Sequence, residues 1–567
     1  MTYTIEKVTT LIGARRYGDN DTNIGFILTD SRSLCFPEET LFFALKSERN
    51  DGHNYIPELY RRGVKNFVVT DVPKGYASDY PEANFLKVVN TLEALQRLAE
   101  RHRDEFNIPI VGITGSNGKT MVKEWLYQLL SPSMFVTRSP RSYNSQIGVP
   151  LSVWLMNEQT QVGVFEAGIS QPGEMLALRD IIQPTIAVLT NVGSAHQENF
   201  SSLEEKCREK LILFHDAETV VYDGDDEVIT KVVAEYPDYK GEKLFWSLKN
   251  PEAPFYVKKI EKQQSVSVIT YIYKGVEDSF SIPFIDDASI QNSIICAAVA
   301  SKLGLSAEDI DKRMALLEPV AMRLEVKVGQ HGCTLINDSY NSDINSLDIA
   351  LDFMNRRPDH RGRRHTLILS DIYQSGQTPD ALYKEVSDLA RKRGVVKFIG
   401  IGPELCKQHD TIQISEKFFF PNVEEFINSE VFASLRDEVI LLKGARQFGF
   451  DQLTELLVQK VHETTLEVNL NAVVANLNYY RAFMKPETKL VCMIKADGYG
   501  AGAVEIAKTL QDHRVDYLAV AVADEGVTLR KNGITSNIMI MNPEMTAFKT
   551  MFDYDLEPEV YSFRLLD

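Results

Sequence analysis

Residues 111–120, VGITGSNGKT, join a short apolar run to a glycine-rich turn. A strict Walker loop has glycine five residues before Gly118, where this chain has Ile113, so the turn is a shortened variant. Its amides can still converge on phosphate oxygens at the start of a helix. We expect Lys119 to reach the outer phosphates and Thr120 to offer its hydroxyl to Mg²⁺. The alternative is a tight strand-to-helix turn with an exposed lysine. A buried strand before the turn and a helix after it favour a nucleotide site formed by Gly115, Ser116, Asn117, Gly118, Lys119 and Thr120.

The bulk composition narrows the class of protein. The 567 residues, 44% of them hydrophobic, predict three to five globular domains with ordinary cores. A formal charge of −18 argues against a general binder of nucleic acid or anionic membranes. No apolar run approaches the roughly 18 residues that span a bilayer, and the N-terminus has no evident signal peptide. The six cysteines are scattered without a CxxC pair, so we expect reduced thiols in the cytoplasm.

The hydrophobic pattern changes three times along the chain, which predicts four α/β domains. Residues 1–104 hold short strands and one clear helix. Residues 105–318 alternate helices with apolar runs of strand length, which is typical of a buried parallel sheet. Residues 319–462 hold a second such unit. In residues 463–567 strand and helix alternate every 20 to 30 residues, as in a (β/α) barrel.

Four stretches, in this order, resemble the Mur ligases, the ATP-dependent amide-bond ligases that build peptidoglycan precursors. They are GITGSNGKT (112–120), VFEAGISQPGEM (164–175), TNVGSAHQENFSSLEEKCREKLILF (190–214), and the pair AMRLEV (321–326) and LINDSYNSDINSL (335–347). The resemblance covers about residues 1–460. It implies a uridine-binding domain, a central P-loop ATPase domain with a parallel sheet, and a Rossmann-like C-terminal domain.

A ligase of this kind moves the γ-phosphate of ATP onto a carboxylate, and both groups are anions, so metal ions must neutralise the charge between them. Glu166 and His196 match the family's metal ligands and join Thr120 as predicted Mg²⁺ ligands. Lys210 matches the lysine that the family carbamylates with CO₂ to make a further metal ligand. The alternative is an ordinary charged helix face, and Lys206 is also available; the spacing from Lys210 to Phe214 favours Lys210.

The resemblance also assigns residues to ATP and to the substrates. Asn292 matches the adenine-side asparagine, and Arg323 matches a catalytic arginine near the phosphates. Asp338 and Asn341 complete the predicted ATP site. The residues predicted to bind the substrates are Ser31, Arg32, Lys46 and His53 at the uridine, Asn144, and Lys443 and Arg446 at the carboxylate of the incoming dipeptide.

Two stretches distinguish among the ligases of this family. SYNSQIGVPLSVW (142–154) and EAGISQPGEM (166–175) resemble the ligase that adds D-alanyl-D-alanine to UDP-N-acetylmuramoyl-tripeptide. One alternative is the relative that adds the third residue, lysine or diaminopimelate. A folate-glutamate ligase is disfavoured because it would lack the N-terminal uridine-binding segment. In a non-catalytic ATP-binding docking module, the predicted metal ligands Glu166, His196 and Lys210 would have no role.

VCMIKADGYGAG (491–502) resembles a second family, the alanine racemases that depend on pyridoxal phosphate (PLP). Lys495 matches the lysine that holds PLP, and Tyr499 the tyrosine at its phosphate; Ala501 replaces the family's histidine. The alternative is a strand lysine followed by a glycine turn. A complete barrel needs eight units and about 250 residues, so we expect an incomplete racemase here. A homodimer through this segment is a further hypothesis.

Overall fold

The computed structural model describes residues 2–34, 36–47, 50–140, 142–193, 199–236, 239–320, 324–339, 342–356, 362–373, 377–445, 448–459, 466–485 and 487–566. The chain forms two compact units. One contains Met1–Ile108, Leu130–Gly163 and Thr464–Asp567, and the other contains Pro109–Leu129 and Val164–Glu463. No helix in the described part of the chain is both long and apolar enough to cross a membrane. The domain boundaries expected from the sequence stay predictions.

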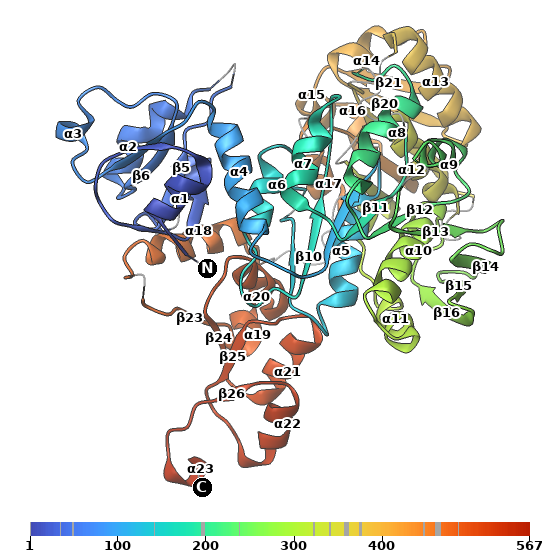
Figure 1. Ribbon diagram of the computed structural model, residues 1–567. Coiled ribbons are helices and arrows are strands. Elements are labelled where there is room, and N and C mark those ends of the chain that lie inside the picture. Colours follow the sequence, from blue (N-terminus) through green and yellow to red (C-terminus); the bar gives the residue numbers. More distant parts are fainter. Residues whose placement is uncertain are drawn as a thin grey trace. The chain divides into compact units, whose positions relative to one another are not determined.

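The first unit begins with a five-stranded sheet in the order β2-β7-β6-β5-β4 (Figure 1). Its strands are parallel except for β2. Side chains of one strand point alternately to opposite faces: Val68 joins the core under α1 and α4, and Phe67 and Val69 join the core on the α2 side. The elements are β1 (Tyr3–Thr4), α1 (Ile5–Ile12), β2 (Arg15–Tyr17), β3 (Asn23–Ile24), β4 (Phe26–Leu28), η1 (Ser31–Ser33), β5 (Thr40–Phe43), η2 (Gly52–Tyr55), α2 (Ile56–Arg61), β6 (Asn66–Val69), α3 (Tyr76–Asp79), β7 (Asn84–Lys87) and α4 (Thr91–Arg103).

The same unit includes β9 (Val136–Arg138), α6 (Gly148–Val153) and an all-parallel sheet in the order β23-β24-β25-β26. Figure 1 shows α21 and α22 along one side of this sheet. The predicted strand–helix alternation is confirmed, and the described strands form an open sheet, not a closed barrel. The elements are α18 (Leu470–Arg481), β23 (Val491–Met493), α19 (Lys495–Gly500), α20 (Ala503–Asp512), β24 (Tyr517–Val520), α21 (Ala523–Lys531), β25 (Asn537–Ile540), η8 (Met545–Ala547), α22 (Phe548–Asp553), β26 (Glu557–Pro558) and α23 (Phe563–Leu566).

The second unit contains the sheet that holds the phosphate loop, in the order β16-β15-β14-β13-β12-β11-β8-β10. The strands from β8 to β13 for which a register is defined are parallel, and β8 and β11 are buried along their whole length, as their apolar sequences predict. The elements are β8 (Ile110–Thr114), α5 (Lys119–Leu130), β10 (Val162–Glu166), α7 (Glu174–Ile182), β11 (Ile186–Leu189), α8 (Leu203–Leu211), η4 (Ile212–Phe214), β12 (Thr219–Asp223), α9 (Glu227–Ala234), β13 (Glu242–Ser247), α10 (Asp287–Lys302) and α11 (Ala307–Met314).

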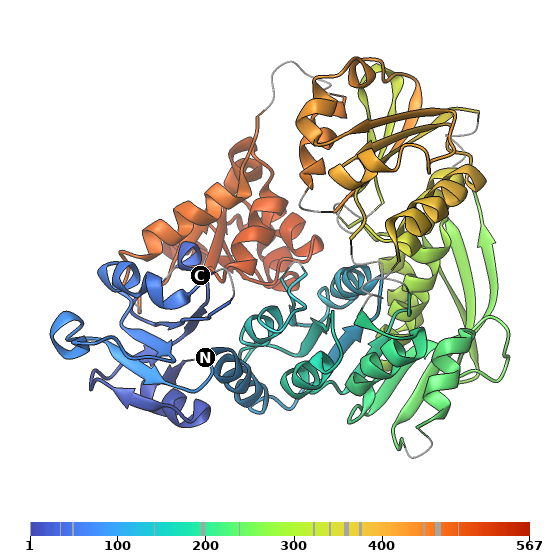
Figure 2. The same ribbon diagram turned by 90° about the horizontal axis from the view of Figure 1, so that it is seen from above.

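The alternation of helix and strand expected for residues 105–318 ends after β13. Strands β14 (Phe255–Lys262), β15 (Ser267–Tyr273) and β16 (Val276–Ile282) instead form an antiparallel meander, light green in Figure 2. Its second turn is only Lys274-Gly275, and both residues have positive φ, 50° and 78°. Such a two-residue turn matches the twist of a hairpin and leaves no room for a helix between the strands.

The second unit ends with a six-stranded sheet in the order β17-β18-β22-β19-β20-β21. Only β17, at one edge, is antiparallel to its neighbour. Buried clusters cover both faces, which gives the Rossmann-like form expected from the sequence. The elements are β17 (Glu325–Val328), η5 (Gln330–Gly332), β18 (Thr334–Asp338), α12 (Ile344–Arg356), β19 (Arg364–Ser370), α13 (Pro379–Lys392), β20 (Lys397–Ile401), α14 (Pro403–Lys407), β21 (Glu416–Phe420), α15 (Val423–Ile427), α16 (Glu430–Ala433), β22 (Glu438–Lys443) and α17 (Phe450–Leu457).

Candidate functional site

The turn between β8 and α5 requires glycine at two places. Gly115 has φ 146° and Gly118 has φ 83°. A Cβ at Gly115 would lie 1.9 Å from Oγ1 of Thr190, and one at Gly118 would lie 2.6 Å from Oδ1 of Asn292. Both the conformation and the close packing therefore exclude a side chain. The second contact also brings Asn292, predicted to bind the adenine, against the phosphate loop.

The residues after β11 hold the loop in shape. Asn191 accepts the amide of Ser116 on its main-chain oxygen and the amide of Asn117 on its side-chain oxygen, both at 3.0 Å. The amide of Gly193 donates to Oγ of Ser116 at 2.8 Å. The first amides of α5 have no acceptor within their own helix and therefore suit an anion. A signal for this support was present in the sequence, because Thr190 and Asn191 directly follow an apolar run of strand length.

Three of the side chains predicted to bind ATP or Mg²⁺ lie around this turn. Nζ of Lys119 donates to the carbonyl oxygens of Gly115 and Ser116, at 2.7 and 3.1 Å. The hydroxyl of Thr120 donates to Oε2 of Glu166 at 3.2 Å. Glu166 is the last residue of β10 and is fully buried. A hydroxyl and a carboxylate oxygen this close together are hard ligands that fit Mg²⁺.

The third predicted metal ligand, His196, lies outside the described residues. Within the described ranges, no group of three histidine, cysteine or acidic side chains is arranged to hold a metal ion. The structure therefore brings together Thr120 and Glu166 of the predicted set, and the complete ligand set stays a prediction.

Lys123 is a buried neighbour of this site that the sequence reasoning missed. Its side chain is fully buried, and its Nζ lies 3.2 Å from Oε1 of Glu166 and 2.8 Å from Oε1 of Glu124. Lys123 therefore holds one oxygen of Glu166 while Thr120 contacts the other. The available signal was its spacing, since Lys119 and Lys123 stand one helical turn apart and share a face of α5.

Lys206 and Lys210 both lie on α8, and both are buried. Nζ of Lys210 donates to the carbonyl oxygen of Gly115 at 3.3 Å, whereas Nζ of Lys206 donates to that of Gly193 at 2.6 Å. Burial, reinforced by the charge of Lys119, holds the pKa of Lys210 well below its usual value. Burial also lowers the pKa of Lys206, to about 8. Of these two lysines, Lys210 is the one that contacts the phosphate loop.

Two predicted residues of the third ligase domain form a buried ion pair. Asp338 ends β18 and Lys443 ends the parallel strand β22, opposite it in register. Nζ of Lys443 lies 2.7 Å from Oδ2 of Asp338. Each of these two side chains neutralises the charge of the other. Their predicted roles, Asp338 toward ATP and Lys443 toward the dipeptide, stay predictions. Arg323, Asn341 and Arg446 lie outside the described residues.

Two of the predicted uridine-facing residues, Arg32 and His53, are held by aspartates that the sequence reasoning did not single out. Asp30 caps η1, accepts the amide of Arg32, and lies 2.6 Å from the exposed guanidinium of Arg32. This ion pair lowers the pKa of Asp30, chiefly through the hydrogen bond from Arg32. Ser31 lies on the same turn and accepts from Arg62 on its main-chain oxygen at 3.0 Å.

His53 has a fixed tautomer. Its Nε2 accepts the amide of Thr70 at 3.1 Å, so the ring proton is on Nδ1 and is donated to Oδ1 of Asp51 at 2.6 Å. Lys46 is exposed, 3.5 Å from Oδ2 of the same aspartate. Asn144, half-buried, lies in the turn before α6. The roles of these residues toward a substrate stay predictions.

The predicted PLP lysine lies at the carboxyl end of a parallel strand. Lys495 follows β23 and is exposed, and Tyr499 is 64% exposed. The residues after Lys495 form a left-handed turn, with φ of 52° at both Ala496 and Asp497. Oε1 of Glu525 accepts the amide of Ala496 at 2.6 Å and holds this turn. The turn therefore presents both predicted PLP residues at the end of the sheet where barrel enzymes bind their ligands.

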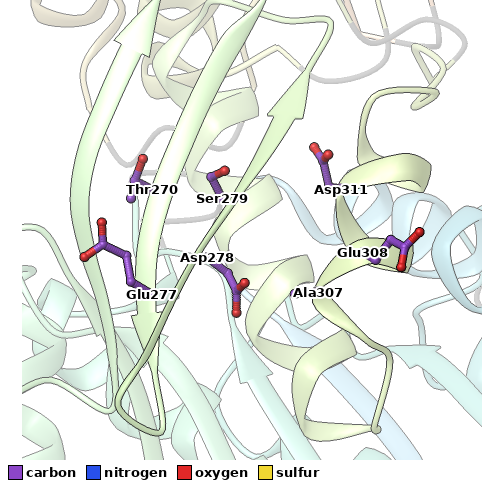
Figure 3. Close-up of a pocket in the computed structure, with 7 residues that line it drawn as sticks. All are labelled: Thr270, Glu277, Asp278, Ser279, Ala307, Glu308 and Asp311. Atoms are coloured by element: carbon purple, nitrogen blue, oxygen red, sulfur yellow. The ribbon is translucent and has the colours of Figure 1, made fainter.

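A pocket of about 560 Å³ lies elsewhere in the second unit, between β15, β16 and α11 (Figure 3). Figure 3 shows the carboxylates of Glu277, Asp278, Glu308 and Asp311 around it. Glu277 pairs with Lys258 at 2.7 Å, and Glu308 pairs with Lys312. An acidic lining disfavours the phosphates of a nucleotide, so this pocket is not the ATP site.

Comparison with known proteins assigns the two parts of the chain. Residues 113–300 match the Mur ligase middle domain, and residues 468–567 match the alanine racemase N-terminal domain. The chain therefore contains a Mur ligase middle domain followed by an alanine racemase N-terminal domain. The two resemblances seen in the sequence are therefore confirmed.

Two relatives carry the name UDP-N-acetylmuramoyl-tripeptide–D-alanyl-D-alanine ligase. The one from Bacillus subtilis is 28% identical over 371 residues, which are 64% of this chain and 77% of the relative. The one from Borreliella burgdorferi is 27% identical over 446 residues, which are 76% of this chain and 93% of the relative.

Two solved structures share the fold of the ligase part. MurF from Acinetobacter baumannii matches with a TM-score of 0.70 and 22% identity, over 80% of this chain and 99% of that one. MurF ligase from Thermotoga maritima, solved in complex with ADP, matches with a TM-score of 0.64 and 22% identity, over 76% of this chain and 96% of that one. The Mur ligase fold predicted for this part of the chain is confirmed.

Proposed function

We propose that the chain is an ATP-dependent amide-bond ligase that adds D-alanyl-D-alanine to UDP-N-acetylmuramoyl-tripeptide. The observation that carries the proposal is the convergence of Lys119, Thr120, Glu166 and Lys210 on the turn at Gly115. The names of the relatives support the choice of substrates. The predicted cytoplasmic location belongs to the same proposal, since this enzyme would act on soluble nucleotide-linked precursors.

The reaction has two steps. A carboxylate oxygen of the tripeptide attacks the γ-phosphorus of ATP, and the bond to the β–γ bridging oxygen breaks, which releases ADP and leaves an acyl phosphate. The amine of D-alanyl-D-alanine then attacks the acyl carbon, phosphate leaves, and the amine loses a proton. The first step brings anions together, so Lys119, now 2.7 Å from a loop carbonyl, stabilises charge on the transferred phosphoryl group.

Thr120 and Glu166 would hold Mg²⁺, which supplies charge neutralisation for the first step. Glu166 offers Oε2 on the side of Thr120, while Lys123 keeps Oε1 in place. The pKa of Lys210 is lowered by burial and by Lys119, which favours the neutral amine that reacts with CO₂. A carbamate on Lys210 would place an anionic oxygen ligand for the metal beside the loop.

The racemase segment fits PLP at Lys495, which lies exposed at the carboxyl end of β23. PLP bound there would supply an electron sink, and Tyr499 would contact its phosphate. The described strands β23–β26 are four of the eight that a complete barrel has, so we assign no racemase activity to these residues by themselves. A homodimer through this segment stays a hypothesis.

ATP turnover tests the ligase proposal. The purified chain is assayed for phosphate release with each UDP-muramoyl peptide, with and without D-alanyl-D-alanine. We expect turnover with the tripeptide only when the dipeptide is present, with formation of the pentapeptide product. Turnover with the UDP-muramoyl-dipeptide plus lysine or diaminopimelate would instead establish the alternative ligase. ATP binding without turnover on any acceptor would favour the docking module.

A further inference from the structure

An arginine of the racemase segment contacts the end of helix α6, which belongs to the ligase part of the same unit. Nη2 of Arg514 donates to the carbonyl oxygens of Trp154, at 3.4 Å, and of Leu155. These two residues directly follow α6, where the last carbonyl groups of a helix lack partners within it. A cation at a helix C-terminus also complements the helix dipole. Arg514 therefore supplies hydrogen-bond donors to the C-terminal end of a helix that lies 360 residues away in the sequence.

The end of α6 is tied in turn to the N-terminal domain. The indole of Trp154 donates to the carbonyl oxygen of Gly25 at 3.0 Å and lies against His102, with ring centroids 4.6 Å apart. His102 contacts the hydroxyl of Tyr3 and the carbonyl oxygen of Met156, at 2.9 and 3.1 Å. Arg514 is thus bonded to the rim of a buried cluster that joins the N-terminal domain to α6.

Two further contacts join the racemase segment to the rest of the first unit. The guanidinium of Arg481 donates to the carbonyl oxygens of His513 and Arg514, at 2.6 and 2.7 Å, and lies 5.1 Å from the ring centroid of Phe36. A Cβ at Gly533 would lie 3.3 Å from Oγ of Ser131. Arg481 thus fixes the turn that carries Arg514 and also contacts the N-terminal domain.

Helix α6 follows the turn that carries Asn144, a predicted substrate residue. Gln146 of that turn is bonded to Gln96 of α4 through its side-chain oxygen, at 2.9 Å. The turn is therefore fixed on one side by α4 and on the other by α6, whose C-terminal end is hydrogen-bonded to Arg514. We propose that the racemase segment stabilises the ligase part of the chain. Arg514 is the positioning residue: it holds α6 and the turn at residues 142–147 in the conformation that binds the acceptor substrate. This inference rests on the proposed ligase function.

The test compares Arg514→Met with Lys531→Met in the full chain. Lys531, on α21, is exposed, so its replacement removes one positive charge from the same segment without touching α6. Hydrogen exchange is followed at residues 142–155 and in β24 and β25, and steady-state kinetics are measured with the UDP-muramoyl-tripeptide as the varied substrate. Loss of a hydrogen-bonded charge predicts about tenfold faster exchange at residues 142–155 and about a tenfold higher KM for the acceptor. The kcat, the KM for ATP and the protection of β24 should stay as in the wild type.

Wild-type exchange at residues 142–155 in Arg514→Met would overturn the inference, and so would an equal rise of KM in Lys531→Met. If Arg514→Met loses the protection of β24, Arg514→Lys, which keeps the charge but shortens the reach to the two carbonyl groups, is judged by the same two readouts. The exchange measurement needs no turnover, so it separates failure of this inference from failure of the proposed ligase function.

Discussion

Replacing Lys123 by methionine should destabilise the second unit. The side chains of Lys123 and Glu166 are both fully buried, with 3.2 Å between Nζ and Oε1. Methionine has a similar length and no charge, so Lys123→Met leaves the carboxylate of Glu166 in place without its buried cation. Thr120 still donates one hydrogen bond to Oε2, which does not compensate for the lost charge.

The expected loss is about 3–5 kcal/mol in the free energy of unfolding, the usual result of removing one partner of a buried ion pair. Urea unfolding can be followed through Trp125, which lies on α5 two residues after Lys123 and donates to the carbonyl oxygen of Glu318 at 3.0 Å. Trp154 and Trp246, the other two tryptophans, are replaced by phenylalanine in the wild type and in every variant, so that the fluorescence comes from Trp125 and reports on this unit near α5.

Two further variants separate the ion pair from general damage to α5. Glu124 is partly exposed, with 21% of its side chain accessible, so Glu124→Gln should cost only about 1 kcal/mol or less. Adding Glu166→Gln to Lys123→Met removes the buried negative charge that has lost its cation and should recover most of the stability. The reasoning is refuted if the unfolding free energy of Lys123→Met lies within about 1 kcal/mol of the wild-type value, which is the typical effect of a point mutation. It is also refuted if Glu166→Gln does not restore the stability.

Three other predictions concern Lys119, Lys210 and His102. Lys119→Ala should keep the unfolding transition of the wild type but lose about a hundredfold or more in kcat, since a charge-stabilising donor is removed; full activity would contradict the phosphate-loop assignment. Lys210→Ala should be nearly inactive and should recover part of its turnover in millimolar acetate, which can occupy the place of the carbamate; wild-type activity would exclude a carbamate. His102 is buried and its pKa is lowered, chiefly by burial, to about 4 from 6.5. The unfolded chain therefore binds a proton that the folded chain does not, and stability should fall by about 3 kcal/mol between pH 6.5 and 4. His102→Phe should show a flatter dependence of unfolding free energy on pH in that window, and an unchanged slope would contradict this origin.

The sequence predicted those parts of the site that depend on local patterns. A buried strand, two glycines and the Lys119-Thr120 pair define a phosphate loop within ten residues, and the structure shows positive φ at Gly115 and Gly118. Glu166 is the last residue of β10, and an apolar run of strand length directly precedes it in the sequence. These signals are contained in a single element and the turn that follows it.

The missed features depend on packing between distant elements. Lys123 looks like an ordinary helix lysine until β10 brings Glu166 to within 3.2 Å of it. Asp51 holds His53 through a ring nitrogen whose tautomer is set by the amide of Thr70, 17 residues further along. The contact from Arg514 to α6 joins residues 360 positions apart. The spacing of Lys119 and Lys123 places both on one face of α5, but no pattern within a single element identifies the distant partner.

The choice between Lys206 and Lys210 shows the limit most directly. Four residues apart on α8, they share a helix face, so the pattern that predicts burial for one predicts it for the other. The structure does bury both, and burial lowers the pKa of each; the charge of Lys119 lowers both further, and that of Lys206 adds to the lowering at Lys210. What separates them is the acceptor at each Nζ: the carbonyl oxygen of Gly193 for Lys206 and that of Gly115, within the phosphate loop, for Lys210. Only a lysine in contact with that loop can place a carbamate beside a metal that would neutralise the phosphates. The packing of α8 therefore supports the proposed role of Lys210, which the sequence favoured only through the spacing from Lys210 to Phe214.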